Sequence, residues 1–371
     1  MTRKILILFA FIAVAYACSE SDDTGSPGTN DSFDRSLMLV HWADNIIIPS
    51  YQDFVPATVN LRTSTTIFVD EPTSTSLNDL RQKWETAYLS FQNVSMFEIG
   101  PAEMVRFRDR MNTYPTNISE ISQLIANGTY DFSLPSTNDA QGFPAMDYLL
   151  NGLGDDSETL AFYTTDTNAE ANRNFLADLA NAIHTLSENV LADWSSSFRD
   201  DFVNNDGSSA SASVDKLTND YIFYYEKALR AGKIGIPAGV FSNDPQPQTV
   251  EAMYAEDFSK ALAMESLQAT ERFFKGQSFN GNQVGPSYEA YLDFLNTIKN
   301  GEDLGSLINS QFTKAKTELN ELDDNFVNQI ETDNSKMLEA YDELQRNVIL
   351  LKVDMLQALS IDVDYVDSDG D

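Results

Sequence analysis

The sequence predicts an all-α protein, and three observations support this class. Apolar residues recur at helical spacing through most of the chain after Ser36, strand-like alternation is scarce, and one Asn-, Gly- and Ser-rich linker spans residues 204–213. The chain has 371 residues, of which 42% are hydrophobic, so it can bury a substantial core. Similar helix counts on either side of the linker favour two halves, residues 36–203 and 214–362.

In the N-terminal half, we expect the first helix to be kinked at Pro49 and to end near Pro56. The next helical stretch is interrupted at Gly100-Pro101. A short apolar helix begins at Pro144, since proline is tolerated in a first turn. The stretches after the first helix cover Leu77 to Met111, Pro144 to Leu153, and Asn172 to Phe198.

The C-terminal half has five segments with the same helical periodicity. They run over Leu217 to Ala231, Val250 to Phe274, Tyr288 to Ile298, Leu304 to Gln329, and Ser335 to Leu359.

The first 17 residues have the order of a secretory signal peptide: a basic start, an apolar run and small residues. Cys18 follows directly, as a lipoprotein signal requires, although Ala15 replaces the usual leucine. A plain signal peptide that ends near a free cysteine is the alternative. Residues 18–35 then read as a flexible acidic tether. We therefore expect a lipoprotein attached through Cys18 to the outer membrane, at its periplasmic face or on the cell surface.

The composition excludes several classes of function. Cys18 is the only cysteine, so no internal disulfide can form. The net charge of −33 repels phosphate backbones, which argues against a nucleic-acid partner. An acidic surface attracts cations, but it is also common on exported proteins.

Candidate catalytic or metal-binding side chains are few. His184 lies among apolar residues and is expected to pack at a helix edge. His41 and Asp44 are three residues apart, so they share a helix face and could ligate a cation together or merely hydrogen-bond. The segment 363–371 resembles a calcium loop in part, but the chain ends before the bidentate glutamate, and we expect a disordered acidic tail.

Four segments, taken in order, resemble the imelysin-like proteins, also called the M75 peptidase family. Together they extend over most of the chain after the tether. They are Asn45 to Tyr51; Trp84 with Phe97-Glu98-Ile-Gly100-Pro101-Ala102; Asn112-Thr-Tyr114-Pro115 with Gln141 to Leu150; and Arg230 to Gly239 with the Glu265-Ser266-Leu267 helix.

The resemblance implies two four-helix-bundle-like halves packed together, an envelope location and a link to iron acquisition. It also implies a Gly-x-His-x-x-Glu signature at the interface of the halves, and some members are metallopeptidases. Here the signature falls on Gly142, Pro144 and Asp147, so proline replaces the histidine and aspartate the glutamate. Proline offers no side-chain lone pair to a metal, so the expected peptidase site is broken or rebuilt.

The sequence thus predicts a non-catalytic binding component of an iron or metal uptake system. Asp147 and Glu98 offer oxygen donors suited to iron or another divalent or trivalent cation. One alternative is a metallopeptidase with a site rebuilt from His41, Asp44, Asp147 and Glu98. Another is a scaffold partner of a TonB-dependent outer-membrane receptor. The expected ligand-binding residues are Trp84, Glu98, Gly142, Phe143, Pro144, Asp147 and Lys233, some of which could instead simply pack the interface.

Replacement of the lipid acceptor tests the anchor. The Cys18→Ser variant should appear in the soluble fraction after cell fractionation, because it has no thiol to accept the diacylglyceryl group. Retention of this variant in the membrane fraction would refute lipid anchoring.

Overall fold

Helices form nearly all the regular structure of the computed structural model, which describes residues 32–365. Within this range the only strands are the two-residue pair β1 (Ile298–Lys299) and β2 (Glu302–Asp303), which are antiparallel. The all-α prediction is confirmed. None of the described helices is long and apolar enough to span a bilayer. Cys18 and the predicted signal peptide lie outside the described residues, as do residues 366–371 of the predicted tail.

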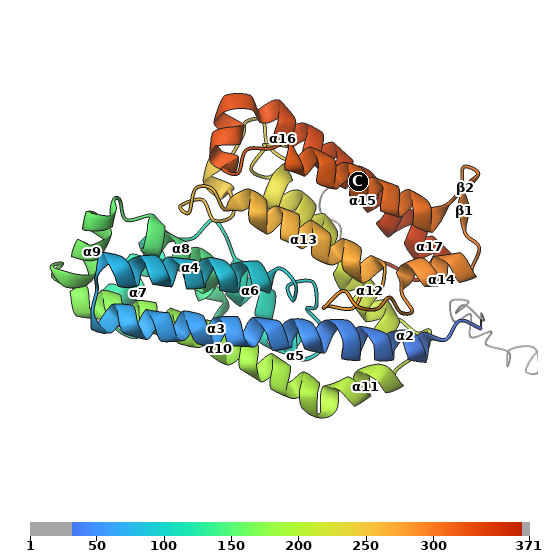
Figure 1. The fold of residues 1–371 in the computed structure, drawn as a ribbon, viewed down its shortest axis with the longest axis horizontal. Coiled ribbons are helices and arrows are strands. Elements are labelled where there is room, and N and C mark those ends of the chain that lie inside the picture. Colours follow the sequence, from blue (N-terminus) through green and yellow to red (C-terminus); the bar gives the residue numbers. More distant parts are fainter. Residues whose placement is uncertain (1–31, 366–371) are drawn as a thin grey trace, which may run out of the picture. The chain divides into compact units, whose positions relative to one another are not determined.

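The N-terminal half is built around two long helices, α3 and α10, which pack along each other, while α4 packs on α3 (Figure 1). Its elements are α2 (Arg35–His41), η1 (Trp42–Ile47), α3 (Ile48–Asp70), α4 (Ser74–Phe91), α5 (Pro101–Val105), α6 (Phe107–Asn112), α7 (Ile118–Asn127), η2 (Pro135–Ala140), α8 (Gly142–Asn151), α9 (Asp156–Thr164), α10 (Ala169–Asp193), η3 (Trp194–Phe198) and α11 (Arg199–Asn204).

The first helix differs from the prediction at its prolines. It runs on through Pro49 and Pro56 as α2, η1 and α3, and it ends only at Asp70. The π-helical segment η1 directly precedes α3, and Pro49 lies in the first turn of α3. Pro56 removes one backbone hydrogen bond inside α3, but Gln52, whose carbonyl would accept it, is exposed and can bond to water. The helix therefore continues.

Aromatic rings fill the core where α3, α4, α6 and α8 meet. Phe143 stacks on Tyr88 with the ring centroids 4.6 Å apart and an interplanar angle of 4°. Phe54, Phe91 and Phe107 surround this pair, and all five rings are buried. Burial of such rings is a main source of core stability, and it fixes α8 against α3 and α4.

The C-terminal half begins after the predicted linker, which corresponds to the loop between α11 and α12. Its helical elements are α12 (Ser213–Phe223), η4 (Tyr224–Gly235), η5 (Pro247–Thr249), α13 (Ser259–Phe274), α14 (Tyr288–Phe294), α15 (Leu304–Asn320), α16 (Phe326–Ile349), η6 (Leu350–Met355) and α17 (Leu356–Leu359).

Several predicted helices of this half have different limits in the structure. The stretch predicted from Val250 becomes helical only at Ser259. The stretch predicted to continue to Gln329 stops at Asn320, and a new helix starts at Phe326. The Asn325 side chain caps this new helix by accepting a hydrogen bond from the backbone N–H of Asn328. This cap stabilises a helix start at Phe326.

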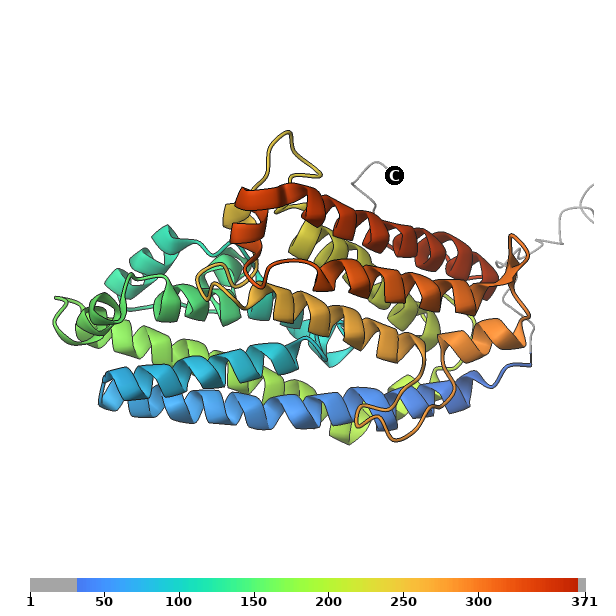
Figure 2. The same ribbon diagram turned by 45° about the horizontal axis from the view of Figure 1, so that its top comes forward.

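Contacts cross the predicted boundary between the halves. Figures 1 and 2 show α2 beside elements of the C-terminal half, although α2 begins the N-terminal one. Trp42 packs against the rings of Phe273 and Tyr288, and the Phe279 N–H donates to the Asn45 carbonyl at 2.9 Å. The start of the first helix therefore packs on the C-terminal half, whereas α3 packs within the N-terminal half.

Two buried tyrosines differ in hydrogen bonding and allow a paired test. The Tyr51 hydroxyl has no hydrogen-bond partner within residues 32–365, whereas the Tyr163 hydroxyl donates to the Leu149 carbonyl at 2.9 Å. Tyr51→Phe should leave the free energy of unfolding unchanged or raise it. Tyr163→Phe should lower it by about 1–2 kcal/mol, because the Leu149 carbonyl loses its donor. Urea titration would measure both, and an equal loss in the two variants would contradict the assignment.

Candidate ligand-binding site

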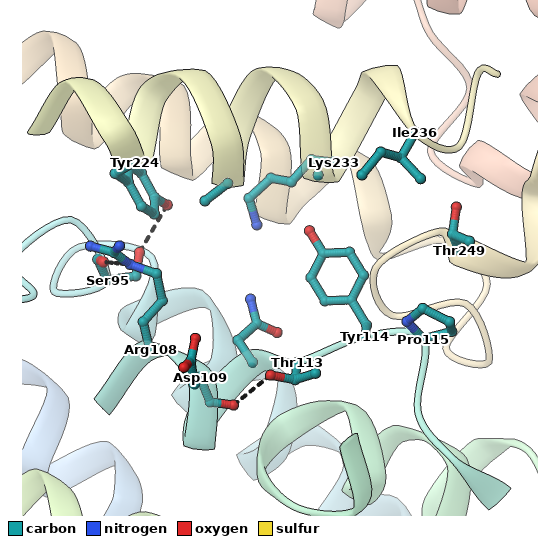
Figure 3. Close-up of a pocket in the computed structure, with 13 residues that line it drawn as sticks. Ser95, Arg108, Asp109, Thr113, Tyr114, Pro115, Tyr224, Lys233, Ile236 and Thr249 are labelled. Carbon is teal, nitrogen blue, oxygen red and sulfur yellow. Dashed lines mark hydrogen bonds between the residues drawn. The ribbon is translucent and has the colours of Figure 1, made fainter. Parts of the chain in front are cut away.

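A cavity of about 350 Å³ lies between the segment that follows α5 and the helix η4 (Figure 3). One wall comes from the N-terminal half and the other from the C-terminal half. On η4 and just beyond it, lining residues recur every four positions, so they share one helical face. The lining residues are Ser95, Arg108, Asp109, Asn112, Thr113, Tyr114, Pro115, Tyr224, Ala228, Gly232, Lys233, Ile236 and Thr249.

Tyr114 reaches across the cavity toward η4 (Figure 3). Gly232 faces its hydroxyl, and a Cβ atom at position 232 would lie 3.1 Å from the Tyr114 oxygen. A larger side chain at this position would therefore meet the tyrosine. Burial raises the pKa of Tyr114 well above its ordinary value, and the Glu251 carboxylate adds to the rise, so the phenol stays protonated.

Lys233 is held by a buried hydrogen-bond network that joins the halves. Its ammonium pairs with the Glu251 carboxylate and donates to Gln92 Oε1 at 3.0 Å. Ser266 also donates to Gln92, at 2.8 Å. The second Glu251 oxygen accepts from the Tyr88 hydroxyl at 3.0 Å, and from the Asn112 amide at 2.7 Å. The network joins α4 and α6 to η4, α13 and the segment before α13.

Arg108 forms a second ion pair beside the cavity. Its Nη2 donates to Asp220 at 2.7 Å, and its Nε donates to the Ser95 carbonyl at 2.7 Å. Burial alone would lower the pKa of Arg108, but the carboxylates of Asp220 and Glu98 outweigh it and raise the pKa. The guanidinium therefore remains charged, and it also lies over the Tyr224 ring.

Glu98 lies behind Arg108 and does not line the 350 Å³ cavity. It accepts from the Arg108 backbone N–H at 2.8 Å and borders a separate cavity of about 220 Å³ with Asp220. Burial raises the pKa of Glu98 to about 7, although the Arg108 guanidinium and its backbone N–H favour the charged form. Glu98 therefore changes its charge near neutral pH.

The segment Gly142 to Asp147 forms the first part of α8. Gly142 has φ 73°, and a Cβ atom there would lie 2.3 Å from the Met111 carbonyl oxygen, so only glycine fits. Pro144 lies in the first turn, where helical amides have no intrahelical acceptor. Pro144 and Asp147 border a small cavity of about 20 Å³, with Tyr114 and Pro115 as common neighbours of the two cavities.

Both carboxylate oxygens of Asp147 accept hydrogen bonds from the protein. One accepts from the Asn151 amide at 3.1 Å, and the other accepts from the Tyr254 backbone N–H at 3.0 Å. Burial raises the pKa of Asp147 to about 7, and these hydrogen bonds only partly offset the rise. Asp147 is thus a buried group that joins α8 to the segment before α13.

The structure separates the other predicted site residues. Lys233 lines the 350 Å³ cavity, and Pro144 and Asp147 lie near it, across Tyr114 and Pro115. Trp84 is fully buried and donates from Nε1 to the Phe143 carbonyl at 3.1 Å, so both residues pack the core.

The predicted cation ligands do not converge. His41 bonds to the Gly276 carbonyl at 2.7 Å, whereas Asp44 pairs with Arg199 at 2.6 Å. Asp147 and Glu98 border different cavities and have different hydrogen-bond partners. Among residues 32–365, no three or more His, Cys, Asp or Glu side chains are grouped to hold a metal ion. The predicted cation site on Asp147 and Glu98 therefore finds no ligand set in the described part of the chain.

Several residues of the site could not be predicted from the sequence. Tyr114 and Asn112 lie in a segment that resembles the family, but the sequence indicates no role for either side chain. Arg108 and Glu251 gave no signal, because a single charged residue in a loop or short helix looks like surface. Only their buried partners reveal them.

The family model of imelysin, Peptidase_M75, matches residues 47–350 of this chain. The chain belongs to the imelysin family. Its structure is similar to that of an imelysin-like protein from Psychrobacter arcticum 273-4, with a TM-score of 0.68 and 16% identity over 89% of this chain and 97% of the other.

A second imelysin-like fold is that of a protein from Parabacteroides distasonis ATCC 8503, described as an iron-regulated protein A precursor. It gives a TM-score of 0.67 and 17% identity over 86% of this chain and 94% of the other. No curated protein matches the sequence. The imelysin prediction is thus confirmed, and these likenesses establish the fold.

The raised pKa of Asp147 gives a pH-dependent test of stability. Because this pKa lies above the ordinary value of 3.8, the folded protein retains a proton that the unfolded chain releases. The buried charge therefore destabilises the fold increasingly as pH rises from about 4 to about 7. Asp147→Asn should remove this penalty, with Asn151 turning its amide to match.

The free energy of unfolding should exceed that of the unmodified protein by on the order of 2 kcal/mol at pH 8, and the difference should shrink toward pH 4. Denaturant titrations at several pH values would measure it. Asp206→Asn, at an exposed loop position, serves as the control and should show no such trend. A difference independent of pH would contradict burial as the cause.

Proposed function

We propose that this imelysin-family protein is a non-catalytic binding component of an iron or metal uptake system in the bacterial envelope. Its ligand would occupy the cavity between Arg108, Tyr114 and Lys233. The observation that carries the proposal is this cavity of about 350 Å³, which lies where the two halves meet and has polar side chains on both walls. Small-molecule sites commonly have this size and position.

A hydrolytic role has less support from the same residues. A metallopeptidase needs ligands to hold the metal and a base to activate water. Pro144 supplies neither at the position of the signature histidine, and both oxygens of Asp147 already accept hydrogen bonds from the protein. The four groups of a rebuilt site, His41, Asp44, Glu98 and Asp147, make contacts with different partners.

The connection to iron rests on the family and on one structural neighbour. That neighbour is described as iron-regulated, and its fold matches 86% of the present chain. The envelope location rests on the signal sequence and Cys18. Binding without catalysis is consistent with a chain that delivers its ligand to another component.

Filling the cavity tests the proposal in cells. A strain that lacks the gene should take up less radiolabelled iron under iron limitation, and the unmodified gene should restore uptake. Gly232→Leu should fail to restore it, because its side chain would occupy the space next to the Tyr114 hydroxyl. Ala228→Leu, on the same wall, serves as a second cavity-filling variant.

Gly207→Leu is the matched control, since nothing lies within 4 Å of a Cβ atom at that loop position. Thermal melts and cellular protein levels would establish that each variant is folded. Full uptake with folded variants at both cavity positions would contradict the proposal and favour the scaffold alternative. Proteolysis by the purified protein that is abolished by Asp147→Ala would favour the peptidase alternative.

A further inference from the structure

We infer that the ligand of the interface cavity is a small oxyanion, bound through carboxylate or phosphate oxygens, rather than a bare metal cation. This inference rests on the proposed function, because it assumes that the cavity is the ligand site. It adds the chemical class of the ligand.

The charges that line the cavity are opposite in sign to those of the chain. The chain has a net charge of −33, yet two of the three charged lining residues are the cations Arg108 and Lys233. The third, Asp109, is exposed. The carboxylates that pair with the two cations, Asp220 and Glu251, are not among the lining residues. Each ion pair therefore contributes its cationic residue, and not its carboxylate residue, to the lining of the cavity.

The hydrogen bonds of the Asp220 and Glu251 carboxylates also favour an anionic ligand. Both oxygens of Glu251 are used, one by Lys233 and the other by Tyr88 and Asn112. Both oxygens of Asp220 are also used, by the Arg108 guanidinium and the Glu98 backbone N–H. The carboxylates that pair with the two cations are thus occupied by protein donors.

Donors, in contrast, remain available. The Lys233 ammonium has three N–H groups and uses two, on Gln92 and Glu251. Tyr224 accepts a hydrogen bond from Ser95 at 2.8 Å, which leaves its own O–H to donate. The Lys233 ammonium and the Tyr114 hydroxyl extend into the same space from opposite walls (Figure 3). A ligand that enters this space must supply acceptors, as oxyanions do.

A bare cation finds the opposite environment. It would meet the cationic residues Lys233 and Arg108, and Asp109 is the only carboxylate residue among the described residues that line the cavity. Hard cations require several oxygen ligands. The carboxylate or phosphate oxygens of an anion, whether free or part of an iron chelate, would instead pair with the donors already present.

Titration calorimetry of the purified protein with three probes tests the inference. Citrate tests carboxylates, inorganic phosphate tests phosphate, and glycerol is the uncharged control. Citrate, phosphate or both should bind with one-to-one stoichiometry, at least tenfold more tightly than glycerol. The affinity should fall as salt is added. Tyr114→Phe should weaken binding about tenfold, because one donor to a charged group is lost.

The sign of a second substitution separates an anion site from a cation site. Asp109→Asn removes the negative charge at the cavity and should strengthen anion binding several-fold at low salt. A cation site would respond with weaker binding. Asp206→Asn makes the same charge change in the loop between α11 and α12, away from the lining residues, and should have little effect.

The inference fails if neither anion binds better than glycerol, or if Asp109→Asn weakens binding. Impaired iron uptake by folded Gly232→Leu and Ala228→Leu variants, together with no anion binding, would overturn only the ligand class. Stoichiometric anion binding, together with normal uptake by those variants, would overturn the proposed function and leave the anion site intact.

Discussion

The buried pair of Lys233 and Glu251 is the interaction on which the arrangement of this protein depends. Taking two charges out of water is costly, and it is tolerated only when each group also has its remaining hydrogen-bonding positions filled. Here Gln92, Tyr88 and Asn112 meet that requirement, and these residues come from the N-terminal half, whereas the pair belongs to the C-terminal half. Any shift between the halves would remove these hydrogen bonds from the buried pair, so the pair favours one alignment of the halves and one position of the ammonium.

The segment Gly142 to Asp147 corresponds to the family signature. It keeps the signature glycine, whereas the side chains at positions 144 and 147 differ from the signature. Gly142 must adopt a positive φ next to the Met111 carbonyl, and this constraint does not depend on a bound metal. Pro144 is accepted because it stands where the helix needs no amide hydrogen bond. Asp147 accepts a hydrogen bond from the backbone of residue 254 and so helps to hold α8 against the C-terminal half. These contacts explain why the segment can keep its backbone geometry without a histidine at position 144.

Two carboxyl groups near the cavity titrate close to neutral pH. Glu98 lies behind Arg108, and Asp147 lies across Tyr114 and Pro115 from the cavity. Burial raises both pKa values to about 7. As pH rises through this range, both groups become negative and the surroundings become less favourable to an anion. Acidification would have the opposite effect, so the affinity for the proposed anion would depend on pH through groups that need not touch it.

The sequence by itself determined the helical class, the family and the loss of the signature histidine, because periodicity and ordered motifs are local properties of the chain. It also indicated Lys233 and the segment that contains Tyr114. Only the tertiary structure decided that Arg108 and Glu251 form buried ion pairs beside the cavity. It also decided that Trp84 and Phe143 are core residues, and that Glu98 and Asp147 lie at different cavities. The physical reason is that a buried charge acquires its role from the partners that surround it, and some of these partners are more than a hundred residues away in sequence, as Asp220 is from Arg108 and Tyr88 from Glu251.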